Sequence, residues 1–266
     1  MNNKILFDSA PQLTIGFIQI AGDINLEMEV GGLLSQIDGV CWRMQKIPFT
    51  NDKLTVKTYN DPACEIPRAV RVFLPKNGRY GNIDVFAFAC TSMSIAVGTD
   101  LINDLLKEGC CKNRDDIVVI NMADAIVEAI GVVSGGYNRI CLLTPYIDEL
   151  HQKTKSFLES CGIKIEKNWN LGLETDSDIS SVNPEWLAEY IEELVEKMKK
   201  KPEVFVICCS AMRVCGYGYI SKLEKRFGVR VITSNQALMW YCLVKGGISK
   251  DELVKIHGYG SLFSGV

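Results

Sequence analysis

The chain has 266 residues, of which 47% are hydrophobic and 23% charged, and its formal net charge is −3. This length suffices for one large domain or two small ones with a buried core, and the charge excludes the extended basic field that nucleic-acid binding requires. No stretch approaches the roughly 18 to 20 uninterrupted apolar residues of a membrane span. The start, MNNKILFDSAPQ, lacks the apolar core of a signal peptide. We therefore predict a cytoplasmic protein that binds neither nucleic acid nor membrane.

Apolar, β-rich runs alternate with amphipathic segments along the chain. The first part of the sequence predicts strands over 13–20, 40–47, 83–89 and 116–120, and helices over 25–36, 64–74, 96–108 and 122–134. The later part predicts strands over 139–144, 163–170, 203–208 and 229–234, and helices over 146–160, 184–200, 217–227 and 235–245. Several strands are continuously apolar, which is typical of a parallel sheet covered by helices on both faces.

The sequence contains a coarse internal echo. IDVFAFACTSMS and EVFVICCSAMR are both apolar runs that stop at a cysteine followed by a hydroxyl residue, and IGFIQIAGDIN is similarly echoed by RICLLTPYIDE. We interpret this as two related α/β lobes that face each other. The first lobe is expected over 1–119, completed by 229–266, and the second over 120–228.

Two cysteines, Cys90 and Cys209, end the echoed strands. Ligands of open α/β sheets bind outside the carboxyl ends of the strands. Thr91, Ser92 and Ser210 would add hydroxyls there, and a following helix start would add free N–H groups, which suit a carboxylate. That field would lower a thiol pKa from about 8.5 toward neutrality. A lone strand-end cysteine is usually core, but the shared context makes a paired active site a competing interpretation.

Several chemistries lack the residues they need. The chain has no Cys-x-x-Cys pair and only two histidines, His151 and His257, which disfavours a zinc site and a Cys–His hydrolase. A nucleotide-binding oxidoreductase would carry G-x-G-x-x-G after the first strand, where this chain reads AGDIN. A cytosolic ligand sensor that kept two lobes without catalysis stays open.

Four motifs in order resemble the aspartate/glutamate racemase superfamily, and most of all its branch of maleate cis–trans isomerases and arylmalonate decarboxylases. They are FACTSMS (88–94), LLTPYIDEL (142–150), ICCSAMR (207–213) and SNQALMW (234–240). The resemblance implies two pseudo-symmetric α/β lobes, each a mostly parallel sheet flanked by helices, with a cleft between them. It also implies catalysis without metal or cofactor, a small carboxylate substrate and, by extension, a homodimer. Each lobe would contribute one catalytic cysteine, Cys90 and Cys209.

The resemblance assigns further residues to the substrate. Asn25 would contact a substrate carboxylate, and Tyr146 would donate its phenol to one, with Thr144 capping the next helix and Pro145 at its first position. Thr91, Ser92 and Ser210 would complete the carboxylate pockets. Maleate isomerases have a second asparagine where this chain reads GLETDSDIS, near Ser177 or Asp178. An acidic residue there would repel a dicarboxylate unless it points away.

These features predict an isomerase or racemase that acts on a small mono- or dicarboxylate through two cysteines, in the manner of a maleate isomerase. An aspartate/glutamate-type racemase, an arylmalonate decarboxylase-like enzyme and a non-catalytic carboxylate sensor are the alternatives. Retention of both cysteines favours isomerase or racemase chemistry, because decarboxylases of this branch keep only the second.

Overall fold

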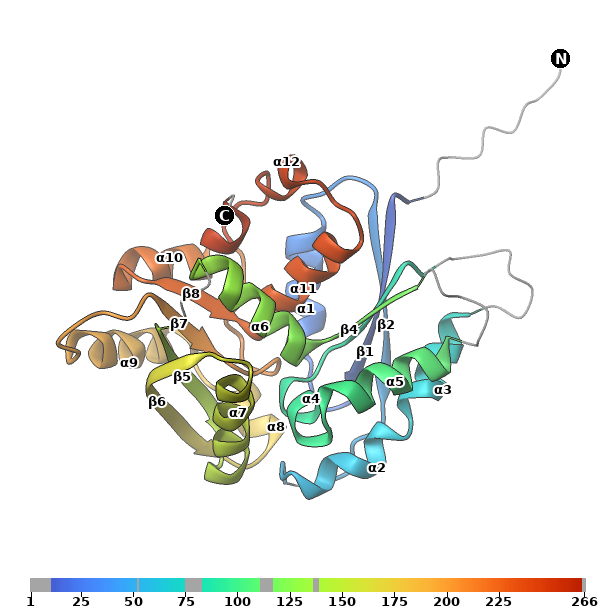
Figure 1. The fold of residues 1–266 in the computed structure, drawn as a ribbon, viewed down its shortest axis with the longest axis horizontal. Coiled ribbons are helices and arrows are strands. Elements are labelled where there is room, and N and C mark those ends of the chain that lie inside the picture. Colours follow the sequence, from blue (N-terminus) through green and yellow to red (C-terminus); the bar gives the residue numbers. More distant parts are fainter. Residues whose placement is uncertain (1–10, 52, 75–82, 111–116, 136–138, 265–266) are drawn as a thin grey trace, which may run out of the picture.

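The protein consists of two four-stranded sheets with helices packed around them (Figure 1). Its computed structural model describes residues 11–51, 53–74, 83–110, 117–135 and 139–264. Residues 1–10, on which the signal-peptide prediction rests, and residue 116 of a predicted strand lie outside this part. The first sheet has the order β2-β1-β3-β4 and the second β6-β5-β7-β8, and every pairing is parallel. The two orders are the same pattern, which confirms the predicted mostly parallel α/β fold.

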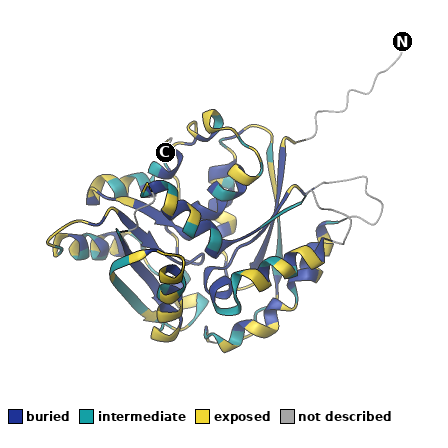
Figure 2. Ribbon diagram, in the orientation of Figure 1, coloured by how far each residue is buried: buried dark blue, intermediate teal, exposed yellow. Residues whose placement is uncertain are grey.

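All eight predicted strands are present, with small shifts of their ends. Their bounds are β1 (Leu13–Ile20), β2 (Val40–Ile47), β3 (Val85–Phe88), β4 (Val118–Asn121), β5 (Arg139–Tyr146), β6 (Lys164–Leu173), β7 (Val204–Ile207) and β8 (Arg230–Thr233). The central strands β1, β3 and β7 are buried throughout, whereas the edge strands β2 and β6 are partly exposed (Figure 2). The continuous apolar runs are therefore central strands that are covered on both faces.

The helices surround and connect these sheets. Their bounds are α1 (Asn25–Leu34), α2 (Asn60–Ala63), α3 (Ile66–Phe73), α4 (Thr91–Val97), α5 (Thr99–Gly109), α6 (Met122–Val133), α7 (Asp148–Ser160), α8 (Asp176–Ser180), α9 (Pro184–Glu196), α10 (Tyr219–Phe227), α11 (Ser234–Lys245) and α12 (Lys250–Leu253), with short 3-10 turns at Lys57–Tyr59 and Ser261–Phe263. Within the described part of the chain, no helix combines the length and apolar character needed to cross a bilayer.

Two helix predictions need correction. The helix predicted over 96–108 begins at Thr99 as α5, because Gly98 adopts a φ of 108° and separates it from α4, a helix that was not predicted. This backbone conformation strains other residue types. The helix predicted from residue 146 begins at Asp148, because β5 continues through Tyr146. Thr144 is therefore no helix cap: its hydroxyl lies 2.9 Å from Nδ1 of buried His151.

One helix that follows the last strand of each sheet packs against the other half. α6 follows β4 of the first sheet and contacts β8 of the second, whereas α11 follows β8 and contacts β3 and β4. The two helices also pack against each other between the sheets (Figure 1). Because β8 belongs to the second sheet, the return to the first lobe begins at α11 rather than at the expected residue 229. The division into lobes otherwise stays a prediction.

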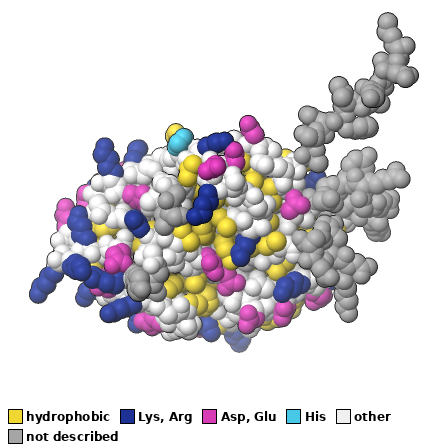
Figure 3. Space-filling model, turned by 45° about the horizontal axis from the view of Figure 1, so that its top comes forward, with side chains coloured by type: hydrophobic (Ala, Val, Ile, Leu, Met, Phe, Trp, Pro, Cys, Tyr) yellow, Lys and Arg dark blue, Asp and Glu magenta, His cyan; other side chains and the backbone are white. Residues whose placement is uncertain are grey.

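Charges on the surface are mixed. On the face in Figure 3, Lys and Arg side chains alternate with Asp and Glu, and apolar side chains lie between them. Such a face has no single sign that would attract a polyanion.

Candidate active site

Cys90 lies at the start of a helix, just beyond β3. It is the N-cap residue of α4, with extended backbone angles, and is 2% exposed. Its carbonyl accepts a hydrogen bond of 2.7 Å from the Ser94 hydroxyl, and its Sγ lies 3.7 Å from the Ser92 hydroxyl. The main-chain N–H of Met93 also stabilises the thiolate form. Strand, cysteine and helix start thus occur in the predicted order.

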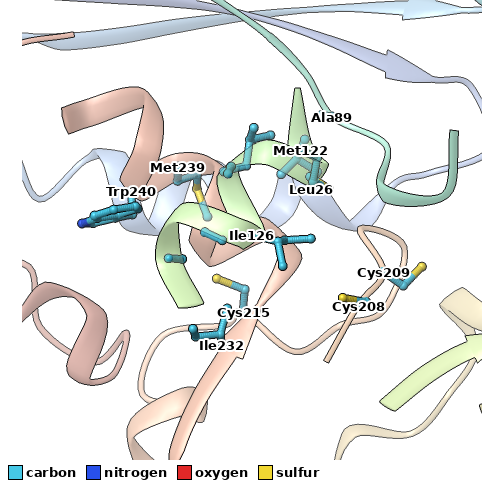
Figure 4. Close-up of a cluster of buried hydrophobic side chains, with 14 of the residues drawn as sticks. Leu26, Ala89, Met122, Ile126, Cys208, Cys209, Cys215, Ile232, Met239 and Trp240 are labelled. Carbon is cyan, nitrogen blue, oxygen red and sulfur yellow. The ribbon is translucent and has the colours of Figure 1, made fainter. Parts of the chain in front are cut away.

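Cys209 lies in a loop instead. After β7 the chain runs without regular structure over 208–218 until α10 begins, so the predicted strand–Cys–Ser–helix pattern is wrong here. Figure 4 shows the side chains of Cys208 and Cys209 diverging on this loop. The Cys208 thiol is hydrogen-bonded to the side chain of Ser234, whereas the Cys209 thiol faces Tyr146.

Contacts from outside the loop hold the Cys209 segment in place. The Asn235 amide donates to the carbonyl of Ser210 at 2.9 Å and to the Glu29 carboxylate at 2.7 Å. Glu29 also accepts the N–H of Cys215 at 2.8 Å. The Asn25 amide donates to the carbonyl of Ala211. The loop is therefore fixed largely by α1, which belongs to the first lobe.

The two thiols share one set of neighbours. Asp23 and Asp176 each raise the pKa of both Cys90 and Cys209. The phenol of Tyr59 is similarly influenced by both thiols, as is the phenol of Tyr146. The structure thus brings the two cysteines of the echoed motifs into a single site between the sheets.

The pKa values of the two thiols contradict the prediction of a pKa near neutrality. Burial raises the pKa of the Cys90 thiol to about 12, and it raises the pKa of Cys209 well above its usual range. Desolvation of the thiolate outweighs the helix start at Cys90, and Cys209 has no helix start at all. The expected pKa near neutrality is therefore wrong for the site without a ligand.

The two tyrosines approach the site from opposite lobes. The Tyr59 hydroxyl lies 2.7 Å from the Ser92 hydroxyl, and both residues are buried. The Tyr146 phenol is near Cys209 but has no well-formed hydrogen bond. A buried, unpartnered O–H costs about 1–3 kcal/mol unless a ligand satisfies it. Tyr146 therefore faces Cys209, and its role toward a substrate carboxylate stays a prediction.

Two carboxyl groups complete the site. Asp23 is fully buried, and its Oδ1 accepts the N–H of Asn25 at 3.0 Å and, more weakly, that of Leu26 at 3.5 Å. Burial raises the pKa of Asp23, although the nearby Ser210 and Gln19 side chains partly offset this. Burial and the charge of Asp23 raise the pKa of Asp176 to about 6.

The remaining predicted residues fall into two groups: some place their polar atoms in the site, and others use them to hold neighbouring segments. Ser92 and Ser210 lie in the site, beside Cys90 and Asp23. The Thr91 hydroxyl is 2.9 Å from that of Ser234 and 3.0 Å from Sδ of Met122, so it fastens α4 to its neighbours. Asn25 uses its amide on the Cys209 loop, and its Oδ1 has no partner.

Sequence reasoning missed Tyr59, Asp23 and Asp176. A signal was available for both aspartates, since each follows the carboxyl end of a parallel strand, as Cys90 does. Near the predicted second position, Asp176 faces the thiols, whereas Asp178 accepts a hydrogen bond of 2.7 Å from Thr175. Tyr59 lies in a short helical turn with no such signal.

The site is nearly closed to solvent: the two cysteines are 2% and 4% exposed. The cleft predicted between the lobes is therefore not open in this structure, and it stays a prediction for a form of the protein in which the lobes lie further apart. In the described residues, no group of three or more His, Cys, Asp or Glu side chains is arranged to hold a metal ion.

Each of the two parallel α/β lobes contributes one thiol to a single buried site. This arrangement defines a class of two-cysteine proteins. A family model described as arylmalonate decarboxylase matches residues 69–263, and the chain belongs to that family. It is 25% identical to maleate isomerase of Alcaligenes faecalis over 187 residues, which cover 69% of this chain and 70% of that protein.

Solved structures share the fold. Maleate isomerase from Pseudomonas putida superposes with a TM-score of 0.79 at 19% identity, covering 95% of this chain and 98% of the other. A Nocardia farcinica maleate cis–trans isomerase variant with a covalently bound succinylcysteine intermediate gives 0.80 at 18% identity, with 94% and 98% covered. Arylmalonate decarboxylase gives 0.70 at 20% identity, with 95% and 100% covered.

Proposed function

We propose that this protein is an isomerase that acts on a small carboxylate through Cys90 and Cys209, in the manner of a maleate isomerase. The observation that carries the proposal is the pair of buried thiols, one from each lobe, with shared neighbours. Addition to a double bond requires a nucleophile and a group that transfers a proton, and two thiols in one site can supply both. The related maleate isomerase of Alcaligenes faecalis supports the same reaction type.

In cis–trans isomerisation, one thiolate adds to one alkene carbon and forms a C–S bond, while the other alkene carbon takes a proton. Rotation about the former double bond, loss of that proton and cleavage of the C–S bond then give the trans acid and restore the thiolate. We assign the addition to Cys90, because the N–H of Met93 in the first turn of α4 stabilises its thiolate. Cys209 is assigned as the proton-transferring partner.

Oxyanion stabilisation would come from groups already in place. Negative charge builds up on the substrate carboxylate as the thiolate adds, and donors aimed at it stabilise the transition state. The unpartnered hydroxyl of Tyr146 is one such donor, and the Ser92–Tyr59 pair provides another. We propose Asn25, Thr91, Ser92, Tyr146 and Ser210 as substrate-binding residues or their supports. A cytoplasmic homodimer that needs no cofactor completes the proposal.

Proton NMR of the purified protein in D₂O tests this reaction, with maleate, aspartate, glutamate and 2-substituted malonates as the panel. Conversion of maleate to fumarate is the expected result. Deuterium at an α carbon with loss of optical activity would establish racemisation instead. Release of CO₂ from a malonate would establish decarboxylation. Silence across the panel, with Cys90 and Cys209 no more reactive than other thiols, would contradict catalysis and favour a sensor.

A further inference from the structure

The first turn of α11 contacts the segment that carries Cys90. Ser234 is the first residue of this helix, and its hydroxyl accepts a hydrogen bond of 2.9 Å from the hydroxyl of Thr91, which directly follows Cys90. Both residues are completely buried, and the bond joins segments that lie 143 residues apart in the sequence. Thr91 is stiff about χ1, so a bond to its hydroxyl also restrains the backbone beside Cys90. α4 therefore positions Cys90 locally, and Ser234 holds α4 to α11.

The next residue of α11 contacts the segment that carries Cys209. The Asn235 amide donates a hydrogen bond of 2.9 Å to the main-chain oxygen of Ser210, which directly follows Cys209. The same amide donates to the Glu29 carboxylate at 2.7 Å, so its two N–H groups have one partner each. Because the acceptor at Ser210 is a main-chain atom, the bond fixes the backbone beside Cys209 rather than a side chain alone.

The first turn of α11 is itself rigid. Thr233 and Gln236 form a capping box: Oγ1 of Thr233 accepts the N–H of Gln236 at 3.3 Å, and Oε1 of Gln236 accepts the N–H of Thr233 at 3.1 Å. The helix packs against α6 and contacts β3 and β4 of the first sheet as well as β8 of the second. Two consecutive residues of such a helix do not move independently. The two cysteine segments, one from each sheet, are thus fastened to a single rigid turn.

This arrangement accounts for the orientation of Thr91. The family resemblance assigns the Thr91 hydroxyl to a carboxylate pocket, but the structure directs it to Ser234 and to Sδ of Met122. The Ser234 hydroxyl is in turn hydrogen-bonded to the thiol of Cys208, the other neighbour of Cys209. These buried polar groups are satisfied within the protein. Alignment of the two segments therefore explains them without a direct contact to substrate.

We infer that Ser234 and Asn235 are positioning residues that hold Cys90 and Cys209 at the separation that the reaction needs. The inference rests on the proposed function, because this separation matters only where both thiols act on one molecule. Addition and proton transfer depend steeply on alignment, and a misplacement of about 1 Å can lower a rate on the order of a hundredfold. Substrate affinity is assigned to other groups, so loss of the positioning bonds should lower kcat far more than it raises KM.

Steady-state kinetics on the substrate identified by NMR test the inference. Ser234→Ala removes the bond to Thr91, and we expect kcat to fall about tenfold or more while KM stays within about twofold. Asn235→Ala should have the same signature. Thr154→Val is the matched control, because the buried Thr154 hydroxyl donates a bond of 2.8 Å to the carbonyl of Leu150 within α7. This variant loses a bond of the same kind that joins no two segments, and its kcat should equal that of the wild type.

A double substitution separates positioning from substrate binding. Thr91→Val loses the hydroxyl and should lower kcat as Ser234→Ala does, whereas Thr91→Ser keeps the hydroxyl and should retain most of the activity. In a chain that already carries Ser234→Ala, Thr91→Val should lower kcat by less than about twofold more, because the bond is already lost. A further rise of KM in that double variant would show that Thr91 binds substrate itself, and would contradict its part in positioning.

Cross-linking reports the separation of the thiols without any turnover. Dibromobimane alkylates one thiol with loss of bromide, and its second arm can then alkylate another thiol close by. Mass spectrometry of the digested protein gives the fraction of reagent on Cys90 whose second arm has reached Cys209. This fraction does not depend on how readily the reagent enters the site. We expect it to fall about threefold or more in Ser234→Ala and to be unchanged in Thr154→Val.

An unchanged kcat or an unchanged cross-linked fraction in Ser234→Ala, with circular dichroism showing a folded protein, would overturn the inference. So would a wild type that forms no cross-link between Cys90 and Cys209, or a Ser234→Ala variant whose KM rises while kcat stays constant. Failure of the proposed function looks different. In that case the cross-linked fraction falls in Ser234→Ala, but the wild type converts no compound of the panel.

Discussion

The surroundings of Cys90 and of Cys209 differ in what holds each thiol in place. Cys90 is positioned locally, as the N-cap of α4, by residues that follow it in sequence. Cys209 is positioned by distant residues, because Asn25 and Glu29 of α1 and Asn235 of α11 fix its loop. Two cysteines at similar strand ends are thus positioned in one site differently, one by local contacts and the other by long-range contacts. The thiol of the second lobe depends on the first lobe for its geometry.

The largest effect should come from removing either thiol. Cys90→Ser and Cys209→Ser should each lower turnover by about 10³-fold or more, because a serine hydroxyl at these positions is a far weaker acid and nucleophile. Steady-state assays on the substrate identified by NMR measure this, with circular dichroism as the check of folding. Exposed Cys161→Ser is the control and should keep wild-type activity. Full activity in Cys90→Ser or Cys209→Ser would contradict two-cysteine chemistry.

The two tyrosines can sharpen the comparison of the two thiol surroundings. Tyr59→Phe removes the 2.7 Å hydrogen bond to Ser92, and Tyr146→Phe removes the phenol that faces Cys209. A buried polar group that loses its hydrogen-bond donor costs about 1–3 kcal/mol, and a substrate carboxylate would lose such a donor, so kcat/KM should fall roughly fivefold to a hundredfold in each variant. Mass spectrometry after alkylation should show a changed rate mainly at Cys90 in Tyr59→Phe and mainly at Cys209 in Tyr146→Phe. Equal changes at both thiols in both variants would show that the two surroundings do not act separately.

Glu29→Gln tests the long-range support of Cys209. Glu29 accepts hydrogen bonds from Cys215 and Asn235, whereas a glutamine can accept only through its one oxygen and presents an N–H₂ to the other donor. The free energy of unfolding in urea should fall by about 1–3 kcal/mol. Glu27→Gln lies on the same helix, pairs with Lys46 at the surface and should cost less than about 1 kcal/mol. Similar losses in the two variants would show that the loop does not rely on Glu29.

The smallest effect concerns Asp176 and pH. Its folded-state pKa of about 6 lies above the ordinary 3.8, so ionisation disfavours the folded state. The resulting loss of stability develops as pH rises from about 4 to 6 and is complete above pH 6. Asp176→Asn should therefore raise the free energy of unfolding by about 2 kcal/mol at pH 7.5 and by little at pH 4. Urea unfolding at both values measures it. The same gain at both pH values would exclude ionisation as the cause.

The sequence predicted the eight strands and their parallel class because short, continuous apolar runs between polar segments are typical of strands that are buried on both faces. It also predicted that Cys90 and Cys209 belong to one site, because the sequence shows both the residue type and the end of each apolar run. What it missed depends on tertiary contacts. The echo of the two motifs predicted a helix start directly after Cys209, whereas α10 begins only at Tyr219. β5 also continues through Pro145 to Tyr146, where a helix start was predicted.

Burial accounts for the remaining errors. The thiol pKa values were predicted from a helix start alone, but desolvation depends on how many atoms cover a sulfur, which the sequence does not show. Likewise, Asn25 and Asp23 lie two residues apart, and the chain geometry alone decides that Asp23 faces the thiols while the Asn25 amide holds the Cys209 loop.

The exchange of α6 and α11 between the halves has a consequence for unfolding. Each sheet is covered in part by a helix that the chain supplies next to the other sheet, so neither half has a complete core of its own. We expect the protein to melt as one cooperative unit, with a calorimetric enthalpy equal to the van't Hoff enthalpy, despite its two sheets. A chain cut between β4 and β5 would yield fragments that remain unfolded apart and regain structure only when mixed.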